Sequence, residues 1–297
     1  VQMTVGGQTS TVRAQDQIPT TAKIVTGKDA SIVLVFSNGA TTQLGSDTEL
    51  IIEEFLQDPF AATVRVADMT EEPSRSRTRL ALNRGELVGN VKKLKHAEGS
   101  SYTVVTPVGA AGIRGTTFRI VFRPVAAGQA FGAIPQPAEF SLTTLEGEVS
   151  FQQGPPAAPN APGGPAAPNA PAAGNGGPPA RPPVSVRTGQ QIVLTMSVSQ
   201  NPAGQFFVGN PPRAPDPVNM PQSTAGQMAQ AAQNLVAASR GTTFAPPPAP
   251  GQPAQPGSTN SPGQTAPAAQ PAPPAPGANP PPRVQPAPRT TPLSGEL

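Results

Sequence analysis

The chain has 297 residues, of which 42 are Pro and 30 are Gly, while aromatic residues make up 4% and Trp is missing. Its net charge is +3 with only 12% charged residues, which gives no strong case for nucleic-acid binding, because that function usually needs a clustered basic face with a matching fold. Without Cys it has neither disulfides nor thiolate nucleophiles, and no apolar run approaches the roughly 18 residues of a membrane-spanning helix. Prolines gather in 152–183 and 209–297, so the N-terminal half is the part able to bury a core.

Residues 1–56 alternate short β-branched segments with turn residues, a pattern that predicts a series of strands. The predicted strands cover 9–13, 22–25, 31–36, 40–44 and 49–55. Asn38-Gly39 between two of them predicts a hairpin, because both residues tolerate the positive φ of a type I′ turn.

Residues 57–78 are interpreted as an insertion with a short strand at 62–67 and a polar loop at 71–77. Strands at 80–82 and 87–94 follow, with Asn83-Arg84-Gly85 as the turn between them. Seven cations form what we call the basic band: Arg75, Arg77, Arg79, Arg84, Lys92, Lys93 and Lys95.

Two interpretations of the basic band stay open. It is either a solvated face or a surface for acidic polymers or lipid headgroups, and interleaved aromatic residues for base stacking are missing. The candidates for polyanion binding are Arg75, Arg77, Arg79, Lys92, Lys93 and Lys95.

Strands at 102–105 and 118–122 flank a run in which Gly109, Gly112 and Gly115 recur every third residue. Glycine allows positive φ and close backbone approach, so we expect a strand, a glycine-lined crossing and a second strand. The spacing is not that of a phosphate-binding loop. Arg114 is the one charge in the run, and its five donors suit several carbonyls at once, so we expect it to staple turns together rather than contact a ligand.

This run resembles the signature of the FecR domain, in which Thr-Pro-x-Gly leads into Val-Arg-Gly-Thr-x-Phe. The matching residues are Thr106, Pro107, Gly109, Arg114, Gly115, Thr116 and Phe118, with Ile113 in place of Val. Segments 37–41, 44–45, 49–50 and 85–87 agree in order, so the resemblance spans roughly 8–150, with a return near 184–198.

The resemblance implies an extracytoplasmic module, in the periplasm or cell envelope, that binds a partner or ligand. In iron-uptake regulators of the family, the domain relays a receptor signal to a sigma factor. This chain shows no cytoplasmic anti-sigma region, so we do not expect direct sigma-factor antagonism. We expect that a signal peptide has been removed before Val1.

Residues 139–151 alternate weakly and predict a strand that is broken at Gly147. Segment 152–183 repeats Ala-Pro-Asn-Ala-Pro, and its apolar surface is too small to offset an ordering cost of roughly 1–2 kcal/mol per residue. Because 184–194 reads again as strand, turn, strand, this segment is interpreted as a loop excursion within one domain.

We therefore expect an all-β domain over 1–208, built of many short strands as a roll, a sandwich or a β-solenoid-like stack. A Pro-rich tail over 209–297 would follow, in polyproline II and coil, except for a helix near 223–240. Thr224 and Gln227 would form its capping box. Its apolar face would consist of Met228, Ala231, Ala232, Leu235 and Val236.

The residues give no pattern for a catalytic, cofactor or metal site. His96 is the only His and lies beside lysines rather than a nucleophile and an acid, so we expect a solvated side chain. Glu53 and Glu54 are adjacent, so a strand would direct them to opposite faces. The remaining acids in pairs are interpreted as ordinary surface residues: Glu71, Glu72, Glu146 and Glu148.

Two hypotheses from different classes follow. The first is a non-enzymatic sensor or adaptor of envelope signalling, whose β domain docks on an envelope protein by an exposed strand edge. The second is a structural or wall-associated envelope protein, whose tail spans the wall and whose basic band holds acidic polymers.

Overall fold

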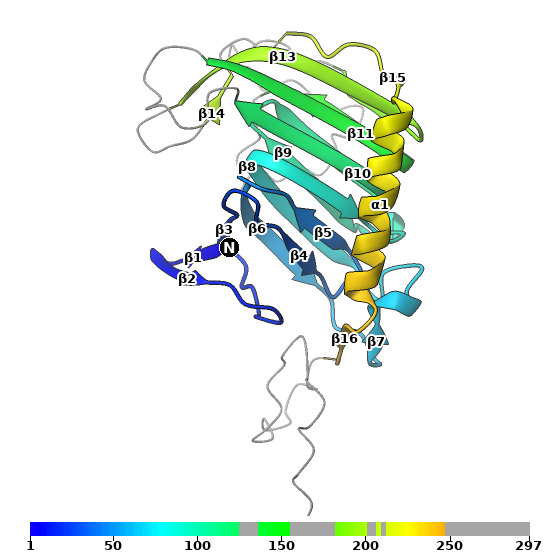
Figure 1. The fold of residues 1–297 in the computed structure, drawn as a ribbon. Coiled ribbons are helices and arrows are strands. Elements are labelled where there is room, and N and C mark those ends of the chain that lie inside the picture. The colour runs from blue at the N-terminus through cyan, green and yellow to red at the C-terminus, as the bar shows by residue number, and fades with distance from the viewer. Residues whose placement is uncertain (125–135, 155–181, 201–205, 209–211, 247–297) are drawn as a thin grey trace, which may run out of the picture. The chain divides into compact units, whose positions relative to one another are not determined.

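The computed structural model describes residues 1–124, 136–154, 182–200, 206–208 and 212–246. Within these ranges the chain is almost wholly β, with one α-helix (Figure 1). The prediction of an all-β fold is therefore confirmed.

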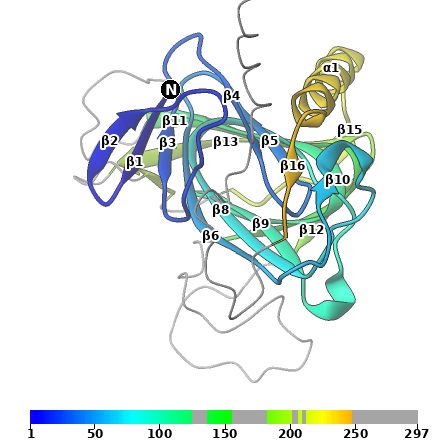
Figure 2. The ribbon, with the colours of Figure 1, turned by 90° about the horizontal axis from the view of Figure 1, so that it is seen from below.

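The strands form one 14-stranded sheet that folds over on itself into two layers, with the core between them (Figure 2). Three long strands belong to both layers: β8 (Ser76–Asn90), β10 (Gly109–Pro124) and β11 (Gln136–Gln153). A separate two-stranded sheet pairs β7 (Val64–Arg65) with β16 (Thr243–Phe244).

Layer 1 is the part of the sheet that ends at the N-terminal hairpin. Across it lie, in order, β2 (Gln8–Thr11), β1 (Gln2–Val5), β3 (Lys23–Val25), β6 (Glu49–Gln57), the first half of β8, β9 (Ser101–Thr106), the first half of β10, the second half of β11, and β12 (Val184–Arg187). All neighbours pair antiparallel except β8 and β9, which are parallel.

Layer 2 contains the other halves of the long strands. Across it lie β4 (Ile32–Val35), β5 (Thr41–Leu44), the second half of β8, the second half of β10, the first half of β11, and β13 (Gln190–Gln200). The short strands β14 (Phe206–Phe207) and β15 (Val218–Asn219) pair with the two ends of β13.

Each long strand passes between the layers at a glycine with positive φ, namely Gly85 (97°), Gly115 (59°) and Gly147 (86°). On β10, residues before Gly115 pair with β9 and residues after it pair with β8. Gly115 and Gly147 lie side by side where β10 and β11 bend, and a Cβ on Gly147 would be 2.8 Å from the Gly115 carbonyl oxygen. We call this pair the glycine corner.

The core contains aromatic rings that join the two layers. Phe140 precedes the bend of β11 and Phe151 follows it, and their rings stack with centroids 5.0 Å apart. Phe118 of layer 2 meets Tyr102 of layer 1 edge-on at 6.4 Å. All four side chains are essentially buried, and each such burial contributes roughly 1.5–3 kcal/mol.

The expected glycine-lined crossing is a strand for most of its length. Gly109 and Gly112 lie in regular pairing with β11, and the register shifts between Arg114 and Thr117 and again between Thr117 and Phe118. Likewise Asn83-Arg84-Gly85 is a bend within continuous β8 rather than a turn between two strands. Tertiary pairing on both sides extends these strands through their glycines.

The hairpin predicted at Asn38-Gly39 joins β4 to β5. Only Gly39 has positive φ (86°), so the turn is not of type I′. The Asn38 side chain is buried instead and donates hydrogen bonds to Ser76 Oγ (3.0 Å) and Thr78 Oγ1 (3.2 Å). The hairpin prediction is confirmed and its turn type was wrong.

The predicted helix is α1 (Gln222–Ser239), and it lies across the strands of layer 2 (Figure 1). Met228 and Leu235 are buried, whereas Val236 of the predicted apolar face is 43% exposed. The capping box was wrong: the helix already begins at Gln222, and its cap makes no side-chain hydrogen bond. The described chain thus packs on the β layers well past residue 208.

Two predictions concern residues largely outside the described ranges. The Pro-rich excursion over 152–183 is described only at its ends, where Phe151 of β11 pairs with Val184 of β12. The tail is described only up to residue 246.

The short insertion strand predicted at 62–67 is β7 followed by the 3-10 turn η1 (Val66–Asp68), and a second such turn is η2 (His96–Glu98).

Candidate functional site

The first signature residues build the turn from β9 to β10, which has Pro107 and Val108 at its tip. The Thr106 hydroxyl donates to the Gly109 carbonyl oxygen (3.0 Å) and accepts from the N–H groups of Val108 and Gly109 (3.3 Å each). At Gly109 a Cβ would lie 2.9 Å from Gln153 Cα. Thr106 and Gly109 therefore hold the turn against β11.

The last signature residues build the bend and the core. A Cβ on Gly115 would lie 3.3 Å from Lys93 Cα, and the Thr116 carbonyl accepts the Val91 N–H (2.9 Å). Phe118 is fully buried over Gly89, where a Cβ would lie 2.5 Å from its ring. The signature thus connects the start and the middle of β10 to its neighbours.

Arg114 differs from the rest of the signature. Ile113 beside it is buried, so the strand alternation turns Arg114 to solvent, opposite the exposed Glu148 of β11. Within the described ranges its guanidinium makes no hydrogen bond or ion pair, so the expected stapling of turns is not seen.

The basic band lies against acids, mostly of the neighbouring strand β6. The ion pairs are Arg75 with Asp58 (3.0 Å), Arg77 with Glu54 (3.3 Å), Arg79 with Glu53 (2.6 Å), Arg84 with Glu49 (3.8 Å) and Lys93 with Glu71 (3.2 Å). Lys95 Nζ donates to the Pro73 carbonyl (3.4 Å), and Lys92 is half-buried. These pairs neutralise most of the band, and polyanion binding by it stays a prediction.

Glu53 and Glu54 do not point to opposite faces as expected. The pairing of β6 with β8 shifts register between Ile52 and Glu54. Both carboxylates thereby reach Arg77 and Arg79, which share one face of β8. A bulge of this kind re-aims side chains and depends on the partner strand.

Glu72 was interpreted as a surface acid, but its side chain is 2% exposed. Its carboxylate accepts hydrogen bonds from Ser76 Oγ (2.5 Å) and from the Lys95 N–H (2.7 Å). Because Ser76 also accepts from Asn38, a buried polar chain ties the hairpin to the insertion. Local sequence carries no signal for this network.

Tyr102 is the only tyrosine of the chain and is buried in the core. Its hydroxyl and Thr42 Oγ1 are joined by a hydrogen bond of 2.9 Å. Burial raises the pKa of Tyr102 above its ordinary value, an effect that the hydrogen bond to Thr42 partly opposes. The side chain stays neutral and links β5 to β9.

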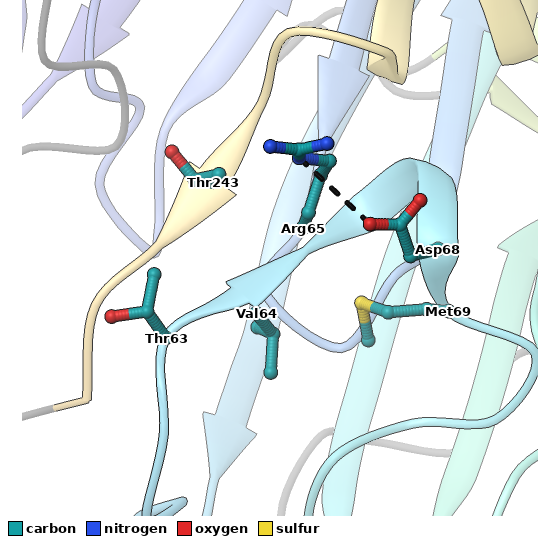
Figure 3. A pocket seen from close by; sticks show the side chains of 6 residues that line it. All are labelled: Thr63, Val64, Arg65, Asp68, Met69 and Thr243. Atoms are coloured by element: carbon teal, nitrogen blue, oxygen red, sulfur yellow. Dashed lines mark ion pairs between the residues drawn. The ribbon is translucent and has the colours of Figure 1, made fainter.

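Among the hollows of the described surface, one lies beside β7 and another beside β12. The first holds about 500 Å³ between β7, η1 and β16, where Arg65 faces Asp68 at 3.8 Å and Met69 and Thr243 complete the wall (Figure 3). The second holds about 530 Å³ beside β12, between Val184 and the residues around Ala214. Neither gathers the converging polar groups of a catalytic site.

His96 is exposed, as expected, with Nδ1 3.0 Å from the Ser100 carbonyl oxygen. Across the described ranges, no three His, Cys, Asp or Glu side chains gather in a group that could hold a metal ion. The helices of the same ranges include none with the length and hydropathy to cross a membrane.

Comparison with known proteins gives a family match and matches to solved structures. The family described as FecR protein matches residues 22–150. Two crystal structures of a "putative anti-sigma factor" from Parabacteroides distasonis ATCC 8503 each match with 13% identity and a TM-score of 0.33. The matches cover 64% of this chain and 59% of that one, so less than two thirds of the solved protein is spanned. No curated protein matches the chain.

Proposed function

Because residues 22–150 of this chain are a FecR domain, we propose that the protein is a non-enzymatic, extracytoplasmic module that docks on a partner protein in envelope signalling. The family match carries this proposal, since it runs from the start of β3 into the second half of β11. It therefore covers the glycine corner and the three strands that join the layers.

The surface supports docking by faces and edges rather than enclosure of a small molecule. The outer face of β13 is open along Val193, Thr195 and Ser197, and Val193 is 43% exposed. Val218 of the neighbouring β15 is 55% exposed. Exposed apolar side chains beside polar ones are suited to a protein partner.

A wall-associated protein that holds acidic polymers is the alternative. It would rely on the basic band, and the ion pairs of that band with acids such as Glu53 and Glu54 weigh against it. Exposed ion pairs are also screened by salt, so this alternative predicts strongly salt-dependent binding.

Photo-crosslinking of the full chain in native envelope tests the proposal. A crosslinking residue is placed at Thr195 on the outer face of β13 or at Arg77 in the basic band. We expect a discrete protein joined one-to-one at Thr195, with a yield that is unchanged at about 1 M salt. If the chain instead crosslinks only from the Arg77 position, to acidic polymer, and salt abolishes this crosslinking, the result would support the alternative.

A further inference from the structure

The N-terminal hairpin of β1 and β2 leaves one margin of layer 1 open. β1 pairs with β3 on one side and β2 on the other, and among the described residues β2 pairs with β1 only. The hairpin projects from the body (Figure 1), and every residue of β2 is exposed.

The register shows which backbone groups of β2 point outward. Val12 N–H donates to the Val1 carbonyl (3.1 Å), and Ser10 is opposite Met3. Hydrogen-bonded pairs alternate along an antiparallel ladder, so Ser10 bonds to β1, whereas the N–H and C=O groups of Thr9 and Thr11 face away. Beyond them, Arg13 N–H is bonded to Asp16 (2.7 Å), which ends the free stretch.

Apart from the short length of β2, which has four residues, this margin lacks the devices that normally block edge-to-edge pairing. Such devices are a charged side chain, a proline or a bulge on the edge strand. The strand Gln8–Thr11 carries only Gln, Thr and Ser, and its pairing with β1 is regular. The free edge is therefore competent to accept another strand.

We propose that β2 pairs antiparallel with β2 of a second copy of this chain, about a two-fold axis at Ser10. In that register Thr9 is opposite Thr11 of the second copy, and the reverse pair is identical. Each pair exchanges two backbone hydrogen bonds, so every outward group of Thr9 and Thr11 is satisfied at once. A single surface that complements itself gives a closed dimer.

The side chains fit the same register. Thr9 and Thr11 of opposite copies meet on one face as β-branched cross-strand partners, which stabilise sheets, and the two Ser10 side chains meet on the other. No like charges are opposed within Gln8–Thr11. The pairing rests on the free edge and does not depend on the proposed envelope partner.

Sedimentation velocity of the purified full chain over a range of concentrations tests the pairing. Thr9→Pro/Thr11→Pro removes the outward N–H donors, which an edge strand tolerates, and with them the contact between the Thr4 and Thr9 hydroxyls (2.9 Å), which the Val variant below also lacks. We expect the Pro variant to weaken the dimer by about tenfold or more. The matched variant Thr9→Val/Thr11→Val keeps the donors and the β-branched shape, so it should dimerise like the parent chain. A parent chain that is monomeric throughout, or equal dimerisation of both variants, would overturn the proposal.

A second readout uses the absence of Cys from the chain. Ser10→Cys places two thiols on a pair that is not hydrogen-bonded, with Cα atoms about 4.5 Å apart, which is within disulfide range. We expect rapid oxidation to a covalent dimer, while Ser197→Cys on the exposed face of β13 stays slow. Equal rates, or capture of a different protein at β2 by a monomeric chain, would contradict self-pairing.

Discussion

At the scale of single residues, Gly115 supports the bend of β10 by a conformation that other residues rarely adopt. Its φ is 59°, and backbone of Lys93 lies 3.3 Å from where a Cβ would be. We predict that Gly115→Val lowers the free energy of unfolding by about 2 kcal/mol or more. The matched control is Gly112→Val, where a Cβ would be 3.7 Å from its nearest neighbour, and we expect a change within about 1 kcal/mol. Similar denaturant midpoints for both variants would show that the bend does not need glycine.

Tyr102 makes stability depend on pH at the same scale. Burial raises the pKa of Tyr102 in the folded state. As the pH is raised, the unfolded chain therefore loses the phenol proton first, near the ordinary tyrosine pKa of about 10. The contribution of the neutral, buried Tyr102 to the free energy of unfolding is fully present below pH 10 and is lost as the pH rises further. We predict that Tyr102→Phe shows a shallower alkaline loss of stability. In the parent chain, tyrosinate absorbance should appear only together with unfolding, and titration near pH 10 in folded chain would contradict this.

At the scale of elements, α1 is bound to layer 2 by few apolar side chains. Leu235 is fully buried, and Val236 next to it is 43% exposed. We predict that Leu235→Ala lowers the free energy of unfolding by about 2–4 kcal/mol and speeds amide exchange along α1. Val236→Ala on the same helix should stay within about 0.5 kcal/mol. Equal exchange in both variants would mean that α1 is not held by this contact.

At the scale of the whole molecule, the antiparallel pairing of β11 with β12 brings the ends of the Pro-rich segment together. We predict that replacing residues 156–181 with a short Gly-Ser linker changes stability by about 1 kcal/mol or less, because loop entropy grows slowly with length. Removing all of 152–183 should cost more. That deletion takes away Gln153, which accepts the Ala214 N–H (2.9 Å) and donates to the Pro212 carbonyl. Calorimetry of both variants measures the change in unfolding free energy. A large loss in the linker variant would show that residues 156–181 stabilise the layers, and a small one would show that they form a passive loop.

The sequence alone was sufficient wherever a short-range rule decides the structure. The all-β class, the hairpin at Asn38-Gly39, the strand-turn-strand after the Pro-rich segment and the helix near 223–240 all follow from local propensity and periodicity. The resemblance to the FecR signature could also be recognised from the sequence, because the signature depends on residue types. Gly115 is required by its positive φ, and Phe118 is required by its large buried side chain.

Only the tertiary structure decided what each strand pairs with and which side chains are buried. Those choices depend on residues far apart in the chain: Glu72 is satisfied by Lys95 N–H, and Arg79 by Glu53. The bends at Gly85 and Gly147 likewise become crossings between layers because the neighbouring strands bend beside them. A bend and a turn have the same local sequence, and the energy that separates them comes from the pairing on either side.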